Sequence, residues 1–286
     1  QIHTAMKNIL LLTDFTSKSE DSHEFACKLF LGQECKFIFL SVQKLWAYTM
    51  DDLMVSTYYG IEEALVGDNK IKVEEQVEKF KDRYTSQKFQ FEGIVDLNYF
   101  TKSVEENTAK YDIDLIVIGS DGVSGISEAI LSSHTLRIIR NVDCPVLMVP
   151  ESYRYERPTR IQYLLDYDDV FEKCGKELLI ELINRYQPEI QAMRLTFGYK
   201  MHTGNFEREF EKIQELFFDC KVNYFTQKFD NPIEFILSHL EIKPAQLQIL
   251  SAQKHSFLEE AFSNSHLKQI VNAAYIPLLI LRDCHS

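Results

Sequence analysis

Residues 115–150, LIVIGSDGVSGISEAILSSHTLRIIRNVDCPVLMVP, carry more information about the fold than any other part of the sequence. This stretch begins with an apolar run, Leu115 to Ile118, that is typical of a strand covered on both faces. The turn Gly119-Ser120-Asp121-Gly122 follows, and nine residues later Ser132-Ser133 opens a predicted helix that ends before the apolar strand Val146 to Val149. A strand, a glycine turn and a helix start in this order can hold phosphate, because both the turn and the helix start present unpaired N–H groups.

The same landmarks occur twice along the chain. ILLLTD (residues 9–14) recurs as IQYLLD (161–166), an offset of 152. Three others recur at an offset of 132: LIVIGS (115–120) as LQILSA (247–252), SSH (132–134) as NSH (264–266), and PVL (145–147) as PLL (277–279). Four landmarks in one order indicate an internal duplication. The offsets differ by 20 residues (152 − 132), which predicts an insertion within Leu45–Gly67, an apolar and aromatic segment after the strand Phe37 to Val42.

Each half is predicted to alternate strand and helix. Apolar residues at helical spacing indicate helices at 25–30, 73–80 and 178–183, between short apolar strands. We therefore expect an α/β fold with two tandem doubly wound parallel sheets of five strands. The expected domains are residues 6–150 and 159–286, joined by the polar segment 151–159, and Met6 is the expected native start.

Composition narrows the class of protein. Asp and Glu outnumber Lys and Arg by 43 to 31, giving a net charge of −12, so non-specific binding to nucleic acid is not expected. No apolar run reaches the roughly 20 residues that span a bilayer, so no membrane association is expected either. The six cysteines show no paired spacing, which favours reduced thiols and a cytoplasmic location.

The chain resembles the universal stress protein family. The resemblance rests on Gly119, two residues, Gly122, nine residues and Ser132-Ser133, together with ILLLTDF near the N-terminus and the strand that Cys144-Pro145-Val146 begins. It covers nearly the whole chain as a tandem of two such domains. It implies an adenine nucleotide (ATP, ADP or AMP) as ligand, with magnesium only as a companion of the nucleotide.

The resemblance assigns roles in the first half residue by residue. It places Thr13 and Asp14 at the adenosine, with Asp14 near the ribose, and gives Val42 a backbone contact to adenine. It gives the phosphates to Gly119, Ser120, Gly122, Ser132 and Ser133. Each residue also has a structural interpretation. Asp14 can cap a helix beginning near Ser17, Val42 can be core, the glycines can form a tight turn without a ligand, and the serines can cap a helix over 135–141.

Three departures from the family pattern affect the ligand. Ser132 replaces a third glycine, Asp121 puts negative charge beside the phosphate path, and Val123 stands where a basic residue is common. These departures favour AMP, ADP or another less charged adenosine ligand over ATP. Asp112, Asp114 and Asp121 flank one strand, but strand alternation explains the first two better than a metal site does.

The second half lacks the phosphate pattern. Ser251-Ala252-Gln253-Lys254 replaces the glycine turn, Asn264-Ser265 keeps only the helix start, and Asp166 is followed by Asp168 and Asp169. We expect this half to be structural. The resemblance also implies that strands 146–149 and 278–281 pair antiparallel within the chain, and it leaves open a homodimer of the tandem.

Three functions remain open from the sequence. The first is a stress-response protein that binds an adenine nucleotide and acts through conformation or partners. The second is an interaction module without a nucleotide, in which both sites are degenerate and the insertion is the functional surface. The third is slow ATP hydrolysis, for which no catalytic constellation or general base is evident, so no catalytic residue and no protein-bound metal are predicted.

Overall fold

The computed structural model describes residues 6–43, 61–120, 128–165, 173–194, 206–226, 232–252 and 266–283. Strands and helices alternate along both halves, as predicted. In the first half the elements are β1 (Lys7–Leu12), α1 (Ser17–Leu29), β2 (Cys35–Gln43), α3 (Ile61–Arg83), β3 (Phe89–Leu97), α4 (Phe100–Lys110), β4 (Leu115–Ser120), α5 (Glu128–Asn141) and β5 (Val146–Pro150). In the second half they are β6 (Arg160–Leu165), β7 (Lys173–Cys174), α6 (Lys176–Tyr186), β8 (Glu189–Arg194), α7 (Phe206–Leu216), β9 (Val222–Thr226), α8 (Pro232–Ile242), β10 (Leu247–Ala252), α10 (His266–Ala273) and β11 (Leu278–Asp283).

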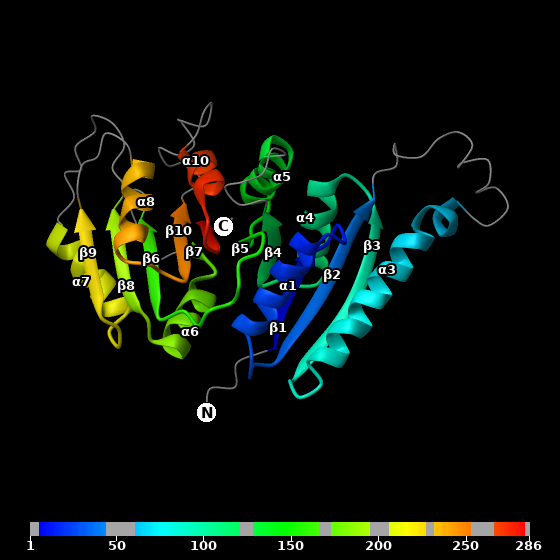
Figure 1. Ribbon diagram of the computed structural model, residues 1–286, viewed down its shortest axis with the longest axis horizontal. Coiled ribbons are helices and arrows are strands. Elements are labelled where there is room, and N and C mark those ends of the chain that lie inside the picture. Colours follow the sequence, from blue (N-terminus) through cyan, green and yellow to red (C-terminus); the bar gives the residue numbers. More distant parts are fainter. Residues whose placement is uncertain are drawn as a thin grey trace.

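The strands form one continuous sheet in the order β3-β2-β1-β4-β5-β11-β10-β6-β8-β9 (Figure 1). Within each half the five strands are parallel, and the second half repeats the order of the first in mirror image. The prediction of two doubly wound, five-stranded parallel sheets is confirmed. The short strand β7, which pairs antiparallel with β11, was not predicted.

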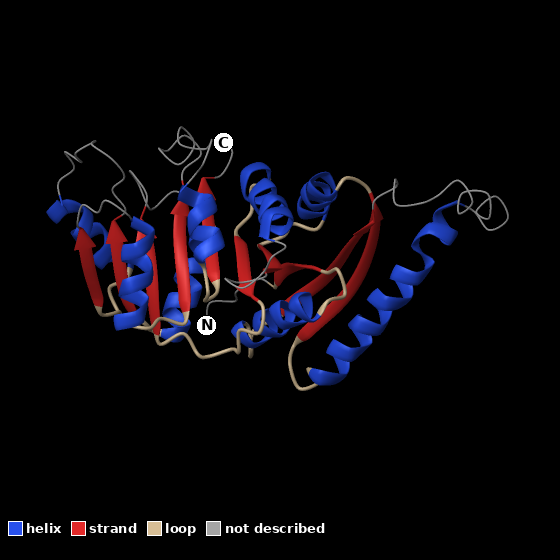
Figure 2. Cartoon of the chain, turned by 45° about the horizontal axis from the view of Figure 1, so that its top comes forward, coloured by secondary structure: helices blue, strands red, loops and turns tan. Residues whose placement is uncertain are grey.

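Helices cover both faces of the sheet (Figure 2). On one face, side chains of α1, α3, α6 and α7 pack on the strands, with Phe25, Phe80 and Leu179 among those buried. On the other face, α4, α5, α8 and α10 pack in the same way, with Val104 and Ile270 buried. Because both faces are covered, the strands can be nearly all apolar, which is the pattern seen in the sequence.

The two halves meet at the antiparallel pair β5–β11. Its register places Met148 opposite Leu278, Leu147 opposite Leu279 and Val146 opposite Ile280. All six side chains are at most 1% exposed. The pairing of strands 146–149 and 278–281 is therefore confirmed, and it leaves neither strand as an open apolar edge.

Contacts beside this strand pair also join the halves. The Lys7 ammonium lies 2.7 Å from the Glu181 carboxylate, and the Tyr186 hydroxyl donates a hydrogen bond to the Leu29 carbonyl at 2.5 Å. Gly175, with φ of +86°, lies where an added Cβ would come within 2.3 Å of Pro145 Cγ. The α1–α6 contact and this close approach fix the angle at which the second half joins the first.

The predicted insertion lies partly inside α3. This helix has 23 residues, whereas α7, its counterpart in the second half, has 11. Residues 61–67 form its first turns, and residues 45–60 lie outside the described residues. Part of the extra length therefore extends a helix along β3, at one outer edge of the sheet (Figure 1).

Gly175→Ala tests the close approach between the halves. The backbone at this position is left-handed, which is strained for any residue with a Cβ, and the new methyl group would overlap Pro145. We expect the free energy of unfolding to fall by roughly 2–4 kcal/mol, measured by urea denaturation. Gly67→Ala is the control, since nothing lies within 4 Å of its added Cβ. A loss for Gly175→Ala no greater than for the control would contradict this packing.

Candidate functional site

A pocket of about 110 Å³ opens at the carboxyl ends of β1 and β4. Leu12 to Asp14 and Ile118-Gly119 supply it from the two strand ends, Lys18 and Ser19 from α1, and Phe100 from the start of α4. The chain leaves β1 for a helix on one face and β4 for a helix on the other. The pocket therefore occupies the topological switch point, where doubly wound sheets bind their ligands.

The turn after β1 is closed by its own side chains. The Phe15 N–H donates to Thr13 Oγ1 at 3.2 Å, and the Thr16 N–H donates to Asp14 Oδ1 at 3.1 Å. The N-cap of α1 is Thr16, whose side chain accepts from the Ser19 N–H. The interpretation of Asp14 as the helix cap is therefore wrong. Thr16 caps the helix, and Asp14 orients the Thr16 side chain by accepting a hydrogen bond from its hydroxyl group.

This turn holds an unusual backbone conformation. Phe15 has φ of +63°, which costs of order 1–3 kcal/mol for a residue with a side chain. The side chains of Thr13 and Asp14 hold it in place by accepting hydrogen bonds from the N–H groups of Phe15 and Thr16. The strained residue lies directly beside the pocket, where such strain is commonly found.

The Asp14 carboxylate is exposed and ionised. Burial of part of the group would raise its pKa, but hydrogen bonds from Thr16 and Ser19 outweigh that effect and lower it below the ordinary value. Thr16 Oγ1 donates to Asp14 Oδ1 at 2.5 Å, so one carboxylate oxygen is engaged in the turn. An ionised carboxylate at the rim can accept hydrogen bonds from a ligand's hydroxyl groups.

Gly119 lies inside β4, not in a turn. It pairs in register with Val149 of β5, and an added Cβ would lie 2.6 Å from the Lys18 carbonyl oxygen. The prediction that Gly119 belongs to a turn is wrong. Glycine is needed here because the first turn of α1 crosses β4 at close range. That approach brings Lys18 to the pocket.

Two other predicted residues lie at neighbouring strand ends. Ser120 is the last residue of β4, and its Oγ is buried with no hydrogen-bond partner in the described part of the chain. Val42 lies near the end of β2, two residues beyond Leu40, where the paired register with β1 ends. Val42 is half-buried against the core and does not line the pocket, and its predicted adenine contact stays a prediction.

The predicted helix start at Ser132 is wrong. Helix α5 already includes Glu128, so Ser132 and Ser133 lie in its second turn. The first four N–H groups of a helix are the unpaired ones, and the N–H of Ser132 comes after those of 128–131. Ser132 and Ser133 are thus not the first residues of the helix. Asp121 and Gly122 lie outside the described residues.

His23 forms a hydrogen bond to the backbone of Leu12, which lines the pocket. Its ring is fully buried on α1, with Nε2 2.9 Å from the Leu12 carbonyl oxygen and Nδ1 3.2 Å from Gln76 Nε2 on α3. The carbonyl can only accept, so Nε2 carries the proton and Nδ1 accepts from the Gln76 amide. The edges of Phe39 and Phe80 enclose the ring, at centroid distances of 5.2 and 6.2 Å.

Burial lowers the pKa of His23 to about 4. The hydrogen bond to Leu12 and the negative charges of Glu20 and Asp14 act in the opposite direction and are outweighed. The ring is therefore neutral at physiological pH, in the one tautomer that its two partners permit.

Sequence reasoning missed Lys18, Ser19, Phe100 and His23. Lys18 and Ser19 follow the predicted Asp14 turn by four and five residues, so a helix beginning near Ser17 places them beside it. Phe100 was not accessible in this way, because only the position of β3 brings the start of α4 to the pocket. His23 is three residues past Glu20, and nothing in its local sequence indicates a buried partner.

The second half differs at the matching positions. Ser251 stands at the place of Gly119 and Tyr163 at that of Leu11, by the offsets of 132 and 152. Both are buried, as is Arg194 on β8, in register with Leu165. Polar side chains thus occupy this face where the first half has a glycine and a leucine. Asp166, Asp168, Asp169, Gln253, Lys254, Asn264 and Ser265 lie outside the described residues.

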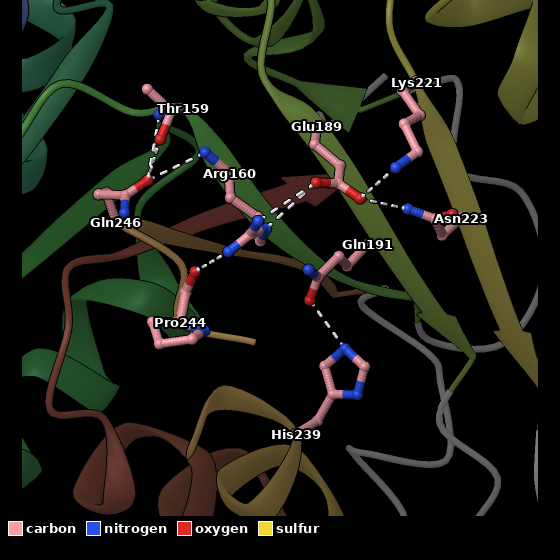
Figure 3. Close-up of polar contacts among 9 residues, drawn as sticks. All are labelled: Thr159, Arg160, Glu189, Gln191, Lys221, Asn223, His239, Pro244 and Gln246. Atoms are coloured by element: carbon pink, nitrogen blue, oxygen red, sulfur yellow. Dashed lines mark hydrogen bonds and ion pairs between the residues drawn. The ribbon is translucent and has the colours of Figure 1, made fainter. Parts of the chain in front are cut away.

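Polar contacts of the second half gather near the amino ends of its strands, away from the positions that match the first-half pocket (Figure 3). Glu189, at the start of β8, accepts from Arg160 at 3.3 Å, Lys221 at 3.0 Å and Asn223 at 2.8 Å. Gln246 accepts from the backbone of Arg160 at 2.9 Å. These contacts tie the amino ends of β6, β8 and β9 together, away from the end at which doubly wound sheets bind ligands, and they are structural.

No cluster of three or more His, Cys, Asp or Glu side chains suited to a metal occurs among the described residues. Asp114 lies just before β4 and accepts from the Asn8 N–H at 2.8 Å, at the end of the strand away from the pocket. Likewise, none of the helices in the described ranges is long and apolar enough to cross a membrane.

The geometry defines a doubly wound α/β protein with a pocket at the switch point of its first half. A family model described as the universal stress protein family matches residues 6–150. The chain belongs to the universal stress protein family. No curated protein matches the chain.

Solved structures support the tandem fold. A universal stress protein from Archaeoglobus fulgidus is 14% identical with a TM-score of 0.70, covering 97% of this chain and 98% of its own. A putative universal stress protein from Pseudomonas aeruginosa is 10% identical with a TM-score of 0.62, covering 97% and 94%. An Arabidopsis thaliana family protein with AMP bound covers 51% and 92%, at 14% identity and a TM-score of 0.36. At these identities the first two likenesses show the fold alone.

Gly119→Ala tests why glycine is needed in β4. The added Cβ would overlap the backbone of Lys18, so α1 must move away from the strand. We expect a loss of about 1–3 kcal/mol in the free energy of unfolding, measured by chemical denaturation. Ser251→Ala is the matched control at the repeated position, where a side chain is already accommodated. Equal, small effects for both variants would show that α1 does not approach β4 this closely.

His23 should resist protonation far below the ordinary pKa of histidine. Because its folded pKa is lowered to about 4 from 6.5, the unfolded chain binds the proton first as pH falls. Stability from this residue is present above pH 6.5 and is lost between pH 6.5 and 4, by roughly 3 kcal/mol. An NMR titration of the imidazole Cε1–H checks this, and a midpoint near 6.5 would refute it.

Proposed function

We propose that this protein binds an adenine nucleotide in its first half and acts in a stress response through conformation or partners. The observation that carries the proposal is the pocket at the β1–β4 switch point. It brings together Thr13, Asp14 and Gly119, three residues to which the family resemblance assigned ligand contacts.

The lining of the pocket suits the parts of a nucleoside phosphate. Leu12, Ile118 and Phe100 offer an apolar surface for a base, and the Asp14 carboxylate offers an acceptor for ribose hydroxyls. The Lys18 side chain and the N-terminal end of α1 favour a negatively charged group on the same side.

The position of α5 supports a ligand with few phosphates. Ser132 and Ser133 lie in the second turn of α5, so their N–H groups are not those of the helix start. The phosphate contacts assigned to these residues by the resemblance are therefore weakened. We propose AMP or ADP in preference to ATP, with magnesium present only as a companion of the nucleotide.

The proposal assigns binding without turnover, in the cytoplasm. No catalytic role is given to Asp14, whose carboxylate serves the turn and the ligand's hydroxyl groups. Cys27, Cys35, Cys144 and Cys220 are free thiols, which supports a reducing environment. The second half is proposed to be structural, and the net charge of −12 supports the proposal that nucleic acid is not a partner.

Asp14→Asn is the sharpest test of the binding role. Asparagine keeps an oxygen for Thr16 but replaces the second carboxylate oxygen, which would accept from ribose, with an NH2 group that can only donate. Affinity for AMP or ADP should therefore fall about tenfold. Isothermal titration calorimetry measures the affinity, and mass spectrometry of molecules released on denaturation identifies any ligand that copurifies.

Asp166→Asn is the matched control, since Asp166 is the repeat of Asp14 in the second half. Its affinity should equal that of the parent protein. A parent that binds none of AMP, ADP and ATP would sink the nucleotide proposal. Loss of binding in Asp166→Asn alone would move the site to the second half.

A further inference from the structure

Helix α3 carries a stripe of polar side chains toward the pocket. Asn69, Lys72 and Gln76 follow one another at spacings of three and four residues, which places them along one side of the helix. Val73 and Phe80 are buried on the sheet and anchor the helix there. The packing of Val73 and Phe80 therefore fixes the position of the polar stripe relative to the sheet.

Two members of the stripe contact segments around the pocket directly. Asn69 Nδ2 donates to Ser41 Oγ at 3.4 Å, near the end of β2. Lys72 Nζ lies 5.7 Å from the centre of the Phe15 ring, in the strained turn after β1. A cation over an aromatic face is attracted to it, so Lys72 helps to keep Phe15 in place.

The third member acts through a buried histidine. Gln76 Nε2 donates to His23 Nδ1, and His23 Nε2–H donates to the Leu12 carbonyl. Leu12 is a wall of the pocket and the last residue of β1. Each ring nitrogen has one partner, and the Gln76 amide keeps the proton of His23 on Nε2. Loss of Gln76 would therefore weaken the hydrogen bond from Nε2–H to the Leu12 carbonyl.

We propose that α3 positions the pocket, with Gln76 and His23 as positioning residues for the segment from Leu12 to Thr16. The identity of the ligand rests on the proposed function, but the positioning does not. Since the contacts order the same segment that a ligand would use, a bound ligand in turn stabilises the packing of α3. The packing of α3, which carries part of the insertion, is thus expected to differ between the ligand-free and the ligand-bound protein.

Gln76→Leu removes the amide and keeps the approximate size of the side chain. In the ligand-free protein, amide hydrogen exchange in a peptide spanning 12–19 should quicken about tenfold. Exchange in β10 and β11, in the other half, should not change. Glu75→Leu is the matched control, an equal change of size on the exposed side of α3.

Gln76→Glu tests the Gln76–His23 contact itself, by placing a carboxylate beside His23 Nδ1. A carboxylate cannot donate to His23 Nδ1 and would attract a proton there, so the pKa of His23 should rise from about 4. Glu20 and Asp14 already favour the charged ring and are unchanged by the variant, whereas Phe39 and Phe80 are uncharged. NMR titration of the imidazole measures the shift.

The outcomes separate the two proposals. Faster exchange at 12–19 in Gln76→Leu but not in Glu75→Leu, with a raised His23 pKa in Gln76→Glu, supports positioning whether or not AMP binds. Unchanged exchange at 12–19 together with an unchanged pKa would overturn it. Absence of AMP, ADP and ATP binding in the parent would overturn the nucleotide function, while these two readouts would still decide the role of α3.

Discussion

The backbone pairing of β5 with β11 joins the sheets of the two halves into one. Parallel strands covered by helices on both faces have to be apolar, and the last strand of each half would otherwise be an apolar open edge. Joining these two edges antiparallel makes one sheet from two and sets the halves in mirror order. It also leaves both switch points free, because they lie between other strands. The pocket of the first half owes its place to this arrangement.

A fused pair allows one copy to change as long as the junction is kept. Apolar strands recur in both halves, and each half supplies one strand of the junction, whereas the second half has Ser251 at the place of the glycine that lets α1 cross β4. Tyr163 and Arg194 are buried nearby on the same half. Side chains therefore fill, in the second half, positions that glycine and leucine hold beside the first pocket. Conservation of the interface and divergence of the site are therefore compatible within one chain.

Much of the fold was predictable because apolar periodicity and the duplication report the same plan. The strand pair at the junction was predicted through the family resemblance, and the register confirms it. The predicted helix starts and turns were less reliable. Ser132 looked like a helix start, but Glu128, Ala129 and Leu131 are strong helix formers and extend α5 upstream. Gly119 looked like a turn because the helix that crosses it is about 100 residues away in the sequence. The contacts of Phe100 and His23 depend on tertiary packing, which a single sequence does not show.

The central claim is that the first half holds the ligand site and the second half does not. The most direct test is a methyl NMR titration with AMP on protein labelled at leucine and isoleucine. Leu12 and Ile118 line the pocket, and Leu164 and Leu250 are their repeats at the offsets of 152 and 132. The account predicts saturable shifts at Leu12 and Ile118, with Leu164 and Leu250 unmoved. Shifts at the second pair alone, or at neither pair with saturating AMP, would contradict it.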